Sequence, residues 1–221
     1  MQLIPTAARA LTVGVVTAAL LAGGGAAVAS PAQPAAASAS RPPAALTSQS
    51  PAATAAAAAG PYARLRPLAD LSAQRLATAD LVAAAKYGTD SPIDDPAREK
   101  QVLDAVALRA RELGADPEAT VRIFRDQIEA NKVVQRGLFR RWDADPSQAP
   151  TERPDLAEVR KEINRINTEL VRGIAASPEA RSAPYCGRVL TAAAVRVRHE
   201  ERLDALHSVA LGRALRSVCE G

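Results

Sequence analysis

Aromatic side chains, histidines and cysteines are scarce in this sequence, and each shortage argues against a class of function. Phe, Trp and Tyr together make up only 3% of the residues, which is too few for the stacking platforms that bind nucleic-acid bases. The two histidines, His199 and His207, lack the spacing of metal ligands, and we expect both to be surface or satisfied polar residues. The folded part also lacks the glycine patterns of nucleophile elbows, phosphate-binding loops and dinucleotide sites.

The charge balance gives no sign of a polyanionic partner. The net charge of +4 comes from 28 basic and 24 acidic residues. Residues 1–69 contain four arginines and neither lysine nor acid, and removing these four from 28 leaves 24 bases against 24 acids. The folded part is therefore neutral overall, and we expect no nucleic-acid partner.

The first residues are typical of a secretory signal. Arg9 supplies a positive region, an apolar stretch spans residues 10–21, and the Ala-Val-Ala at 27–29 fits a cleavage site. An uncleaved membrane anchor is the alternative, but the apolar run is too short to span a bilayer and is followed by three glycines at 23–25. We predict a signal peptide over residues 1–30, a secreted or periplasmic protein, and no membrane contact after cleavage.

The segment that follows has little to bury. Ala, Pro, Ser, Thr and Gln dominate it, and such a composition cannot offset the entropy of ordering. We predict a disordered linker over residues 31–66 and one folded domain over residues 67–221, which at about 150 residues is long enough for a real core.

Helical periodicity runs through the whole domain, so we predict an all-α, single-domain bundle of about six helices with a long third helix. Asp95, Asp116 and Asp155 are expected helix caps, and Gly114 is an expected helix end. The predicted helices cover residues 68–87, 95–113, 116–142 and 155–173, a short piece at 177–184, and most of 187–218.

Two cysteines, Cys186 and Cys219, lie near the C-terminus of a chain predicted to be exported. A disulfide is the default in an oxidising compartment, and two free thiols are the alternative. A straight helix over 187–218 would separate the cysteines by roughly 47 Å, whereas a disulfide needs Cα atoms within about 7 Å. If they pair, the segment must fold back as a helical hairpin, and we place its turn at 196–200.

Several of these helices carry polar side chains on the stripe that should be apolar. Long basic side chains often reach solvent from such positions, and any one of these residues alone would be unremarkable. Together they predict an interior that holds an anion, because buried charges are costly unless they are paired. The residues are Arg75, Lys86, Arg98, Asn131, Gln135 and Arg160.

The stretch Pro-Ile-Asp-Asp-Pro-Ala-Arg-Glu at 92–99 resembles the opening of the second helix in the all-helical chorismate mutases. The similarity extends to the helix before it, at 74–86, and to the helix after it, at 123–135. The Pro-rich connection at 142–160 and the Ser-Ala-Pro-Tyr-Cys at 182–186, with the terminal Cys219, are similar to the exported subclass. The resemblance covers about residues 67–219.

The resemblance implies conversion of chorismate to prephenate by a concerted intramolecular Claisen rearrangement, with no metal and no other cofactor. It also implies a homodimer, and because Arg160 lies in the same chain as the other residues, we expect a complete active site in each subunit. Position by position, it assigns catalytic roles to Lys86, Gln135 and Arg98. It assigns substrate contacts to Arg75, Arg160, Asp95, Glu99 and Asn131.

These implied roles divide by chemistry. The three arginines would bind the two substrate carboxylates, because guanidinium forks match carboxylates. Lys86 and Gln135 would donate to the ether oxygen, and the acids Asp95 and Glu99 would lie near the substrate hydroxyl, with Asp95 also able to orient Arg98. Asn131 departs from the Ser or Thr expected beside the ring carboxylate, although its amide can still donate.

Two other functions stay open at this point. An isochorismate-pyruvate lyase would keep the same fold and change the reaction. A non-catalytic exported helical protein would bind a partner through its surface, although the inward cations disfavour that reading.

Overall fold

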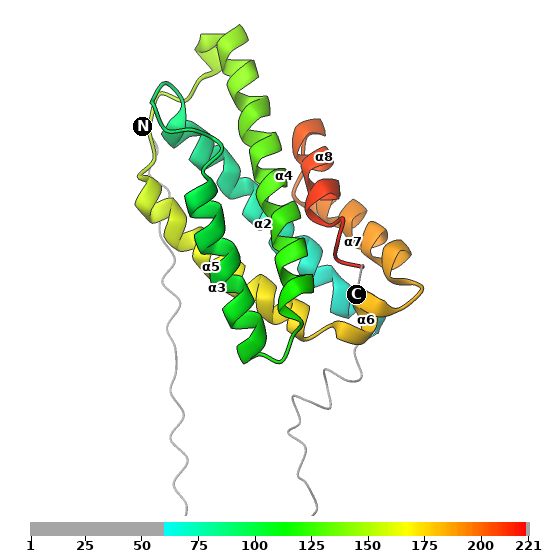
Figure 1. Ribbon diagram of the computed structural model, residues 1–221. Coiled ribbons are helices and arrows are strands. Elements are labelled where there is room, and N and C mark those ends of the chain that lie inside the picture. The colour runs from blue at the N-terminus through cyan, green and yellow to red at the C-terminus, as the bar shows by residue number, and fades with distance from the viewer. Residues whose placement is uncertain (1–59, 220–221) are drawn as a thin grey trace, which may run out of the picture. The chain divides into compact units, whose positions relative to one another are not determined.

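The computed structural model describes residues 60–219 of the chain, and all of the structure in this range is helix, turn or loop (Figure 1). The predicted signal peptide and most of the predicted linker lie outside the described residues. None of the described helices is long and apolar enough to cross a membrane. The α-helices are α2 (Pro61–Lys86), α3 (Pro96–Glu112), α4 (Pro117–Ala144), α5 (Leu156–Ala175), α6 (Pro178–Ser182), α7 (Cys186–Glu200) and α8 (Ala205–Ala214), and a 3-10 turn, η1, covers Pro146–Gln148.

The predicted all-α class and the long third helix are confirmed. Within the described residues there are seven α-helices, where about six were expected, and α4 is the longest at 28 residues. Aspartate caps explain where the main helices begin: Asp95, Asp116 and Asp155 each accept a backbone N–H from the first turn of α3, α4 and α5. Gly114 ends α3 in the left-handed conformation, with φ of +71°.

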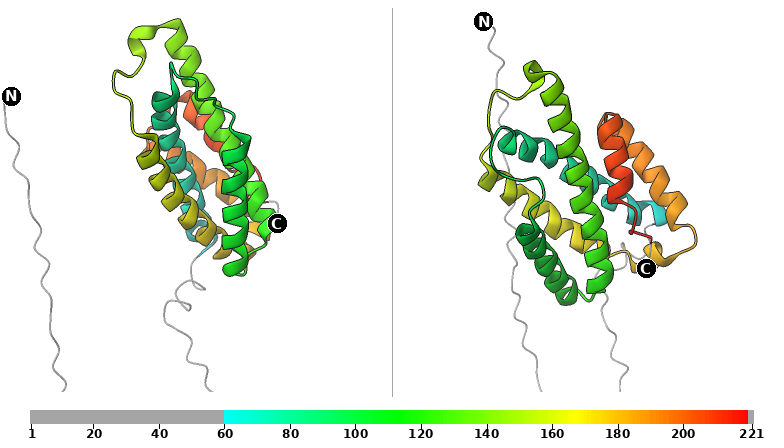
Figure 2. Two further views of the ribbon diagram at one scale, coloured as in Figure 1. Left: turned by 60° about the vertical axis from the view of Figure 1, so that its left-hand side comes forward. Right: turned by 45° about the horizontal axis from the view of Figure 1, so that its top comes forward.

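The central helix of the bundle is α2, which packs against α4, α5, α7 and α8. Helices α3 and α5 lie on one side of the α2–α4 pair, and α7 and α8 lie on the other (Figures 1 and 2). Leu68, Leu76, Phe124 and Leu211 are fully or almost fully buried in the core between these elements. The side of the bundle that holds α3 and α5 contains the site described below.

Two of the helix boundaries that differ from the sequence-based expectation have a clear structural reason. Helix α2 begins at Pro61, so residues 61–66 are helical and not part of the linker. Leu65 is fully buried, and the helix accommodates Pro67 within its second turn. At the other boundary, α5 continues past Gly173, whose missing side chain lets α2 approach: a Cβ atom there would lie 2.9 Å from the side chain of Leu68.

The predicted C-terminal hairpin is confirmed, and so is its disulfide. Cys186 and Cys219 are bonded, with their Cα atoms 5.7 Å apart, and α7 and α8 fold back on each other. The predicted turn position of 196–200 is wrong, because α7 continues to Glu200 and the reversal falls at 201–204. Arg202 lies in this turn with φ of 52°, in the left-handed conformation that glycine usually adopts.

Candidate active site

A cleft opens among α2, α3, α4 and α5, beside the connection that leads into α3. All eight of the residues that the sequence analysis singled out line it: Arg75, Lys86, Asp95, Arg98, Glu99, Asn131, Gln135 and Arg160. Lys132 also lines it, together with an apolar set made of Val82, Ile93, Val102, Ile128, Leu156 and Ile163. Polar groups that are far apart in the sequence therefore converge on one partly apolar space, which is the usual form of a small-molecule site.

Arg75, on α2, is the most deeply buried cation of the cleft and is 4% exposed. Its Nε donates to Asn167 Oδ1 at 2.9 Å, and its Nη1 donates to the carbonyl of Gln127 at 2.9 Å and to Asn131 Oδ1 at 3.1 Å. All of these acceptors are neutral oxygens. Burial accordingly lowers the pKa of Arg75 to about 10. A buried guanidinium with only neutral acceptors is suited to receive an anion from the cleft.

Lys86 lies at the C-terminal end of α2 and is 9% exposed. Its Nζ donates to the carbonyl of Pro92 at 2.7 Å. Burial lowers the pKa of Lys86, Asp95 opposes this shift, and the nearby positive charge of Arg160 adds to it. The ammonium has three donors, so the bond to Pro92 leaves it able to donate to a ligand as well.

Asp95 and Arg98 lie in the first turn of α3, where the Asp95 carboxylate accepts the backbone N–H of Arg98 at 3.0 Å. Asp95 therefore acts on Arg98 through the backbone. The guanidinium of Arg98 donates instead to Gln101 Oε1 at 3.2 Å and, across to α5, to Asn164 Oδ1 at 3.4 Å. Since a guanidinium carries five N–H groups, Arg98 can keep these bonds and still bind a carboxylate.

The amides of the cleft come from α4. Asn131 accepts from Arg75 and donates from Nδ2 to the carbonyl of the same residue at 3.3 Å, so it holds Arg75 in place. Gln135, one turn further along, is 5% exposed, and its Oε1 is buried and finds no hydrogen-bond partner among the described residues. A buried acceptor without a donor is costly, so Oε1 is suited to accept from a ligand or a water molecule, whereas the Nε2 group is the part of Gln135 that can donate.

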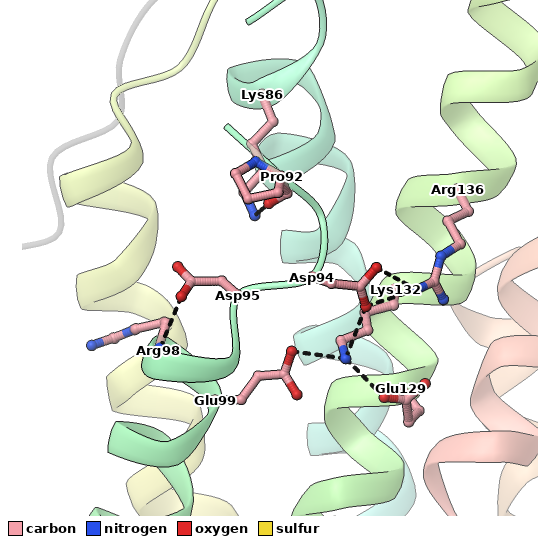
Figure 3. A network of polar contacts seen from close by, with 9 residues as sticks. All are labelled: Lys86, Pro92, Asp94, Asp95, Arg98, Glu99, Glu129, Lys132 and Arg136. Carbon is pink, nitrogen blue, oxygen red and sulfur yellow. Dashed lines mark hydrogen bonds and ion pairs between the residues drawn. The ribbon is translucent and has the colours of Figure 1, made fainter. Parts of the chain in front are cut away.

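Lys132 was not predicted as a site residue. It follows Asn131 on α4, and its Nζ contacts Glu99 at 2.7 Å, Glu129 at 2.9 Å and Asp94 at 3.2 Å (Figure 3). Burial disfavours its charge, but the hydrogen bonds to these carboxylates prevail and raise the pKa of Lys132. Glu99 is thus held toward α4 by an ion pair.

Sequence reasoning missed Lys132 because its neighbour Asn131 was taken as the inward residue at this level of α4. One signal was available: Lys132 lies four residues after Ile128, which is itself a cleft residue, and residues four apart share a helix face. Asn167, which fixes Arg75 from α5, was also missed, because the sequence does not indicate its contact with α2.

The side chains that line the cleft carry a net positive charge. Five cations face two carboxylates, a balance of +3: the cations are Arg75, Lys86, Arg98, Lys132 and Arg160, and the carboxylates are Asp95 and Glu99. A balance of this sign in a partly desolvated space favours a ligand with more than one negative charge. The apolar side chains between the cations favour a compact carbon skeleton.

Comparison with known proteins agrees with this chemistry. Residues 66–136 match the family described as chorismate mutase type II. A protein of Mycolicibacterium smegmatis named secreted chorismate mutase is 39% identical over 163 residues, which is 74% of this chain and 90% of that protein. The protein of the same name from Mycobacterium tuberculosis is 35% identical over 74% of this chain and 82% of its own length.

Solved structures give the same result. The crystal structure of chorismate mutase from Burkholderia thailandensis is 37% identical, with a TM-score of 0.68 over 71% of this chain and 99% of that one. The secreted chorismate mutase of Yersinia pestis, at 23% identity and a TM-score of 0.58, shares the fold.

Proposed function

The chain is an exported member of the chorismate mutase type II family, and on that premise we propose that the cleft among α2, α3, α4 and α5 is where it converts chorismate to prephenate. In this reaction the ether C–O bond breaks while a new C–C bond forms within the same molecule, so no atom or electron is gained or lost. The task of the protein is to hold the reactive conformer and to stabilise the negative charge that grows on the ether oxygen.

The carboxylates of the substrate would be bound by the three arginines. Arg75 is the anchor, because it is buried, charged and bonded only to neutral oxygens. Arg160 faces the same space from α5 and Arg98 from α3, so the two carboxylates would be held from different helices. Contacts from separate, rigid elements restrict the substrate to the folded conformer in which the reacting carbons are close.

The ether oxygen would lie between Lys86 and Gln135, which approach the cleft from α2 and α4. Both are almost buried, so little water competes for the developing charge, and a fixed donor in such a place is worth more than in solution. Asp95 and Glu99 lie at the α3 side and would accept from the substrate hydroxyl. No step in this scheme needs a proton to move.

The observation that carries the proposal is the buried, uncompensated charge of Arg75. The test is to offer chorismate and isochorismate separately to the purified protein and to identify the products. Prephenate from chorismate supports the proposal, whereas salicylate from isochorismate would indicate a lyase. If Lys86→Ala and Arg98→Ala each consumed chorismate at the wild-type rate, the cleft would not be the active site. A wild-type protein that consumed neither compound would be a non-catalytic binder.

We also propose that the protein is a homodimer, as the family resemblance implies. The cations and amides assigned to the substrate lie around one cleft of a single chain, and we propose that each subunit carries its own site. Sedimentation equilibrium over a range of concentrations tests the dimer, and a monomer at every concentration would contradict it.

A further inference from the structure

Residues 92–95, which we call the strap, connect the turn after α2 to the first turn of α3 and have no regular secondary structure. Two strap residues, Ile93 and Asp95, line the cleft. Asp95 also caps α3, so the end of the strap is fixed to that helix. The rest of the strap is held by contacts with α4 (Figure 3).

The contact with α4 is made by Asp94, whose side chain turns away from Lys86 toward Arg136 and Lys132 in Figure 3. Both carboxylate oxygens of Asp94 lie 2.8 Å from Nη2 of Arg136, and Oδ1 also lies 3.2 Å from Nζ of Lys132. The two cations hold the pKa of Asp94 below its ordinary value, so this group stays ionised. We call the Asp94–Arg136 pair the latch. Arg136 is not among the residues that line the cleft.

The strap also reaches the lysine assigned to the ether oxygen. The carbonyl of Pro92, two residues before Asp94, accepts the 2.7 Å hydrogen bond from Nζ of Lys86. A lysine side chain has a flexible stem of four carbons, and without a fixed partner it samples many conformations. One fixed acceptor removes much of that freedom and directs the remaining two N–H groups of the ammonium.

We propose that Arg136 is a positioning residue: through Asp94 it fixes the strap, and through the carbonyl of Pro92 the strap orients Lys86 for the developing charge on the ether oxygen. This inference rests on the proposed function for its catalytic consequence. The orientation of Lys86 itself does not depend on which reaction the cleft supports.

The latch is too exposed to contribute much to the free energy of unfolding. The side chains of Asp94 and Arg136 are 57% and 42% exposed, and exposed ion pairs contribute little to folding free energy. If the latch acts on Lys86, its loss should lower activity while leaving thermal stability almost unchanged. A purely structural pair would show the opposite pattern or no effect.

The first test compares Arg136→Ala with Arg140→Ala, a matched control at an exposed arginine one turn further along α4. For Arg136→Ala we expect kcat to fall about tenfold, because misplacing a catalytic group by a fraction of an ångström has effects of that order. KM should stay within about twofold, because Arg75 and Arg160 are untouched. Arg136→Lys should recover part of the loss, and Arg140→Ala should match the wild type.

A double-variant cycle separates the latch from a general effect of charge. Asp94→Ala removes the shared partner, so adding Arg136→Ala to it should lower kcat no further if the two residues act as one unit. Independent, multiplying losses would overturn the proposal, and so would an Arg136→Ala enzyme with the kcat of Arg140→Ala.

The second test needs no substrate. Limited acetylation followed by peptide mass spectrometry reports how accessible the Lys86 amine is in each variant. Lys86 should be modified several times faster in Arg136→Ala than in the wild type or Arg140→Ala, because the strap is then held only by Lys132 and by the cap at Asp95. Equal rates would overturn the latch whatever the activities. Faster modification in a protein that leaves chorismate unchanged would support the latch and contradict the proposed function.

Discussion

Replacing Arg75 with methionine should remove most of the activity and little of the stability. The buried guanidinium is bonded only to neutral oxygens, and burial lowers its pKa from the ordinary range of arginine to about 10. At 1.36 kcal/mol per pKa unit, this difference corresponds to about 3 kcal/mol of unfavourable free energy in the folded protein. A substrate carboxylate that pairs with Arg75 can recover an amount of that order.

The same numbers set the expected loss of activity. If Arg75→Met removes about 3 kcal/mol of interaction with the substrate, kcat/KM should fall roughly 200-fold. Stability should fall only modestly, because the relief of about 3 kcal/mol offsets much of the loss of three hydrogen bonds to a charged group, each worth about 1.5 kcal/mol or more. A residual of about 1.5 kcal/mol would lower Tm by about 3–6 °C in a domain of this size.

The assay is chorismate consumption together with thermal unfolding followed by circular dichroism. Arg172→Met is the control, since Arg172 is exposed on α5, and it should match the wild type in both measurements. Two results would refute the reasoning about Arg75. One is a kcat/KM within a few-fold of the wild type. The other is a fall in Tm of more than about 10 °C, which would show that Arg75 serves mainly to hold the fold together.

Three further predictions concern pH and the disulfide. Wild-type kcat/KM should be nearly constant from about pH 5 to 8, because a neutral amide donates at every pH. It should fall at higher pH as Arg75 and Lys86, whose pKa values burial lowers, lose their charge. Gln135→Glu should instead lose activity from lower pH as its carboxyl ionises, and parallel profiles for the two proteins would argue against Gln135 as a donor. Hydrogen bonds to Asp80 and Asp204, opposed by burial, raise the pKa of His207 from 6.5 to about 9. The protonated His207 should therefore contribute about 1–2 kcal/mol to the free energy of unfolding below pH 6.5, and this contribution should be lost as pH rises through about 9. Denaturant titrations at pH 6 and pH 10 should show this difference in the wild type and not in His207→Ala. Reduction of the disulfide between α7 and the C-terminus should lower the free energy of unfolding by about 3–4 kcal/mol, given the sequence separation of 33. It should leave kcat/KM at 25 °C unchanged, because neither cysteine lines the cleft. Equal stability of the oxidised and reduced proteins would contradict the estimate.

The parts of the fold that could be predicted are those with local signals. Aspartate followed by proline at 95–96 and 116–117 determines where α3 and α4 begin, and the geometry of a disulfide requires the C-terminal hairpin. The turn at 201–204 could not be predicted, because its left-handed residue is Arg202 and not the glycine that usually marks such a position. The end of α5 was misplaced because Gly173 serves close packing with Leu68 and does not end the helix.

The site residues with a local signal could be predicted, and their long-range contacts could not. The inward cations could be predicted, because each is a polar residue at a position where the periodicity of its own helix calls for an apolar one. The partners of those cations were not visible, because they come from other elements: Asn167 on α5 holds Arg75, and Asn164 holds Arg98. The latch between Asp94 and Arg136 was missed for the same reason, as it joins residues that are 42 positions apart.

The measurement that tests the central claim most directly is the rate at which purified Lys86→Ala converts chorismate to prephenate. Its matched control is Lys161→Ala, which alters an exposed lysine on α5. If the cleft is the active site, the wild type and Lys161→Ala should turn over chorismate equally, and Lys86→Ala should be slower by about 100-fold or more, as expected when a buried donor to a developing oxyanion is removed. Wild-type turnover by Lys86→Ala would contradict the account.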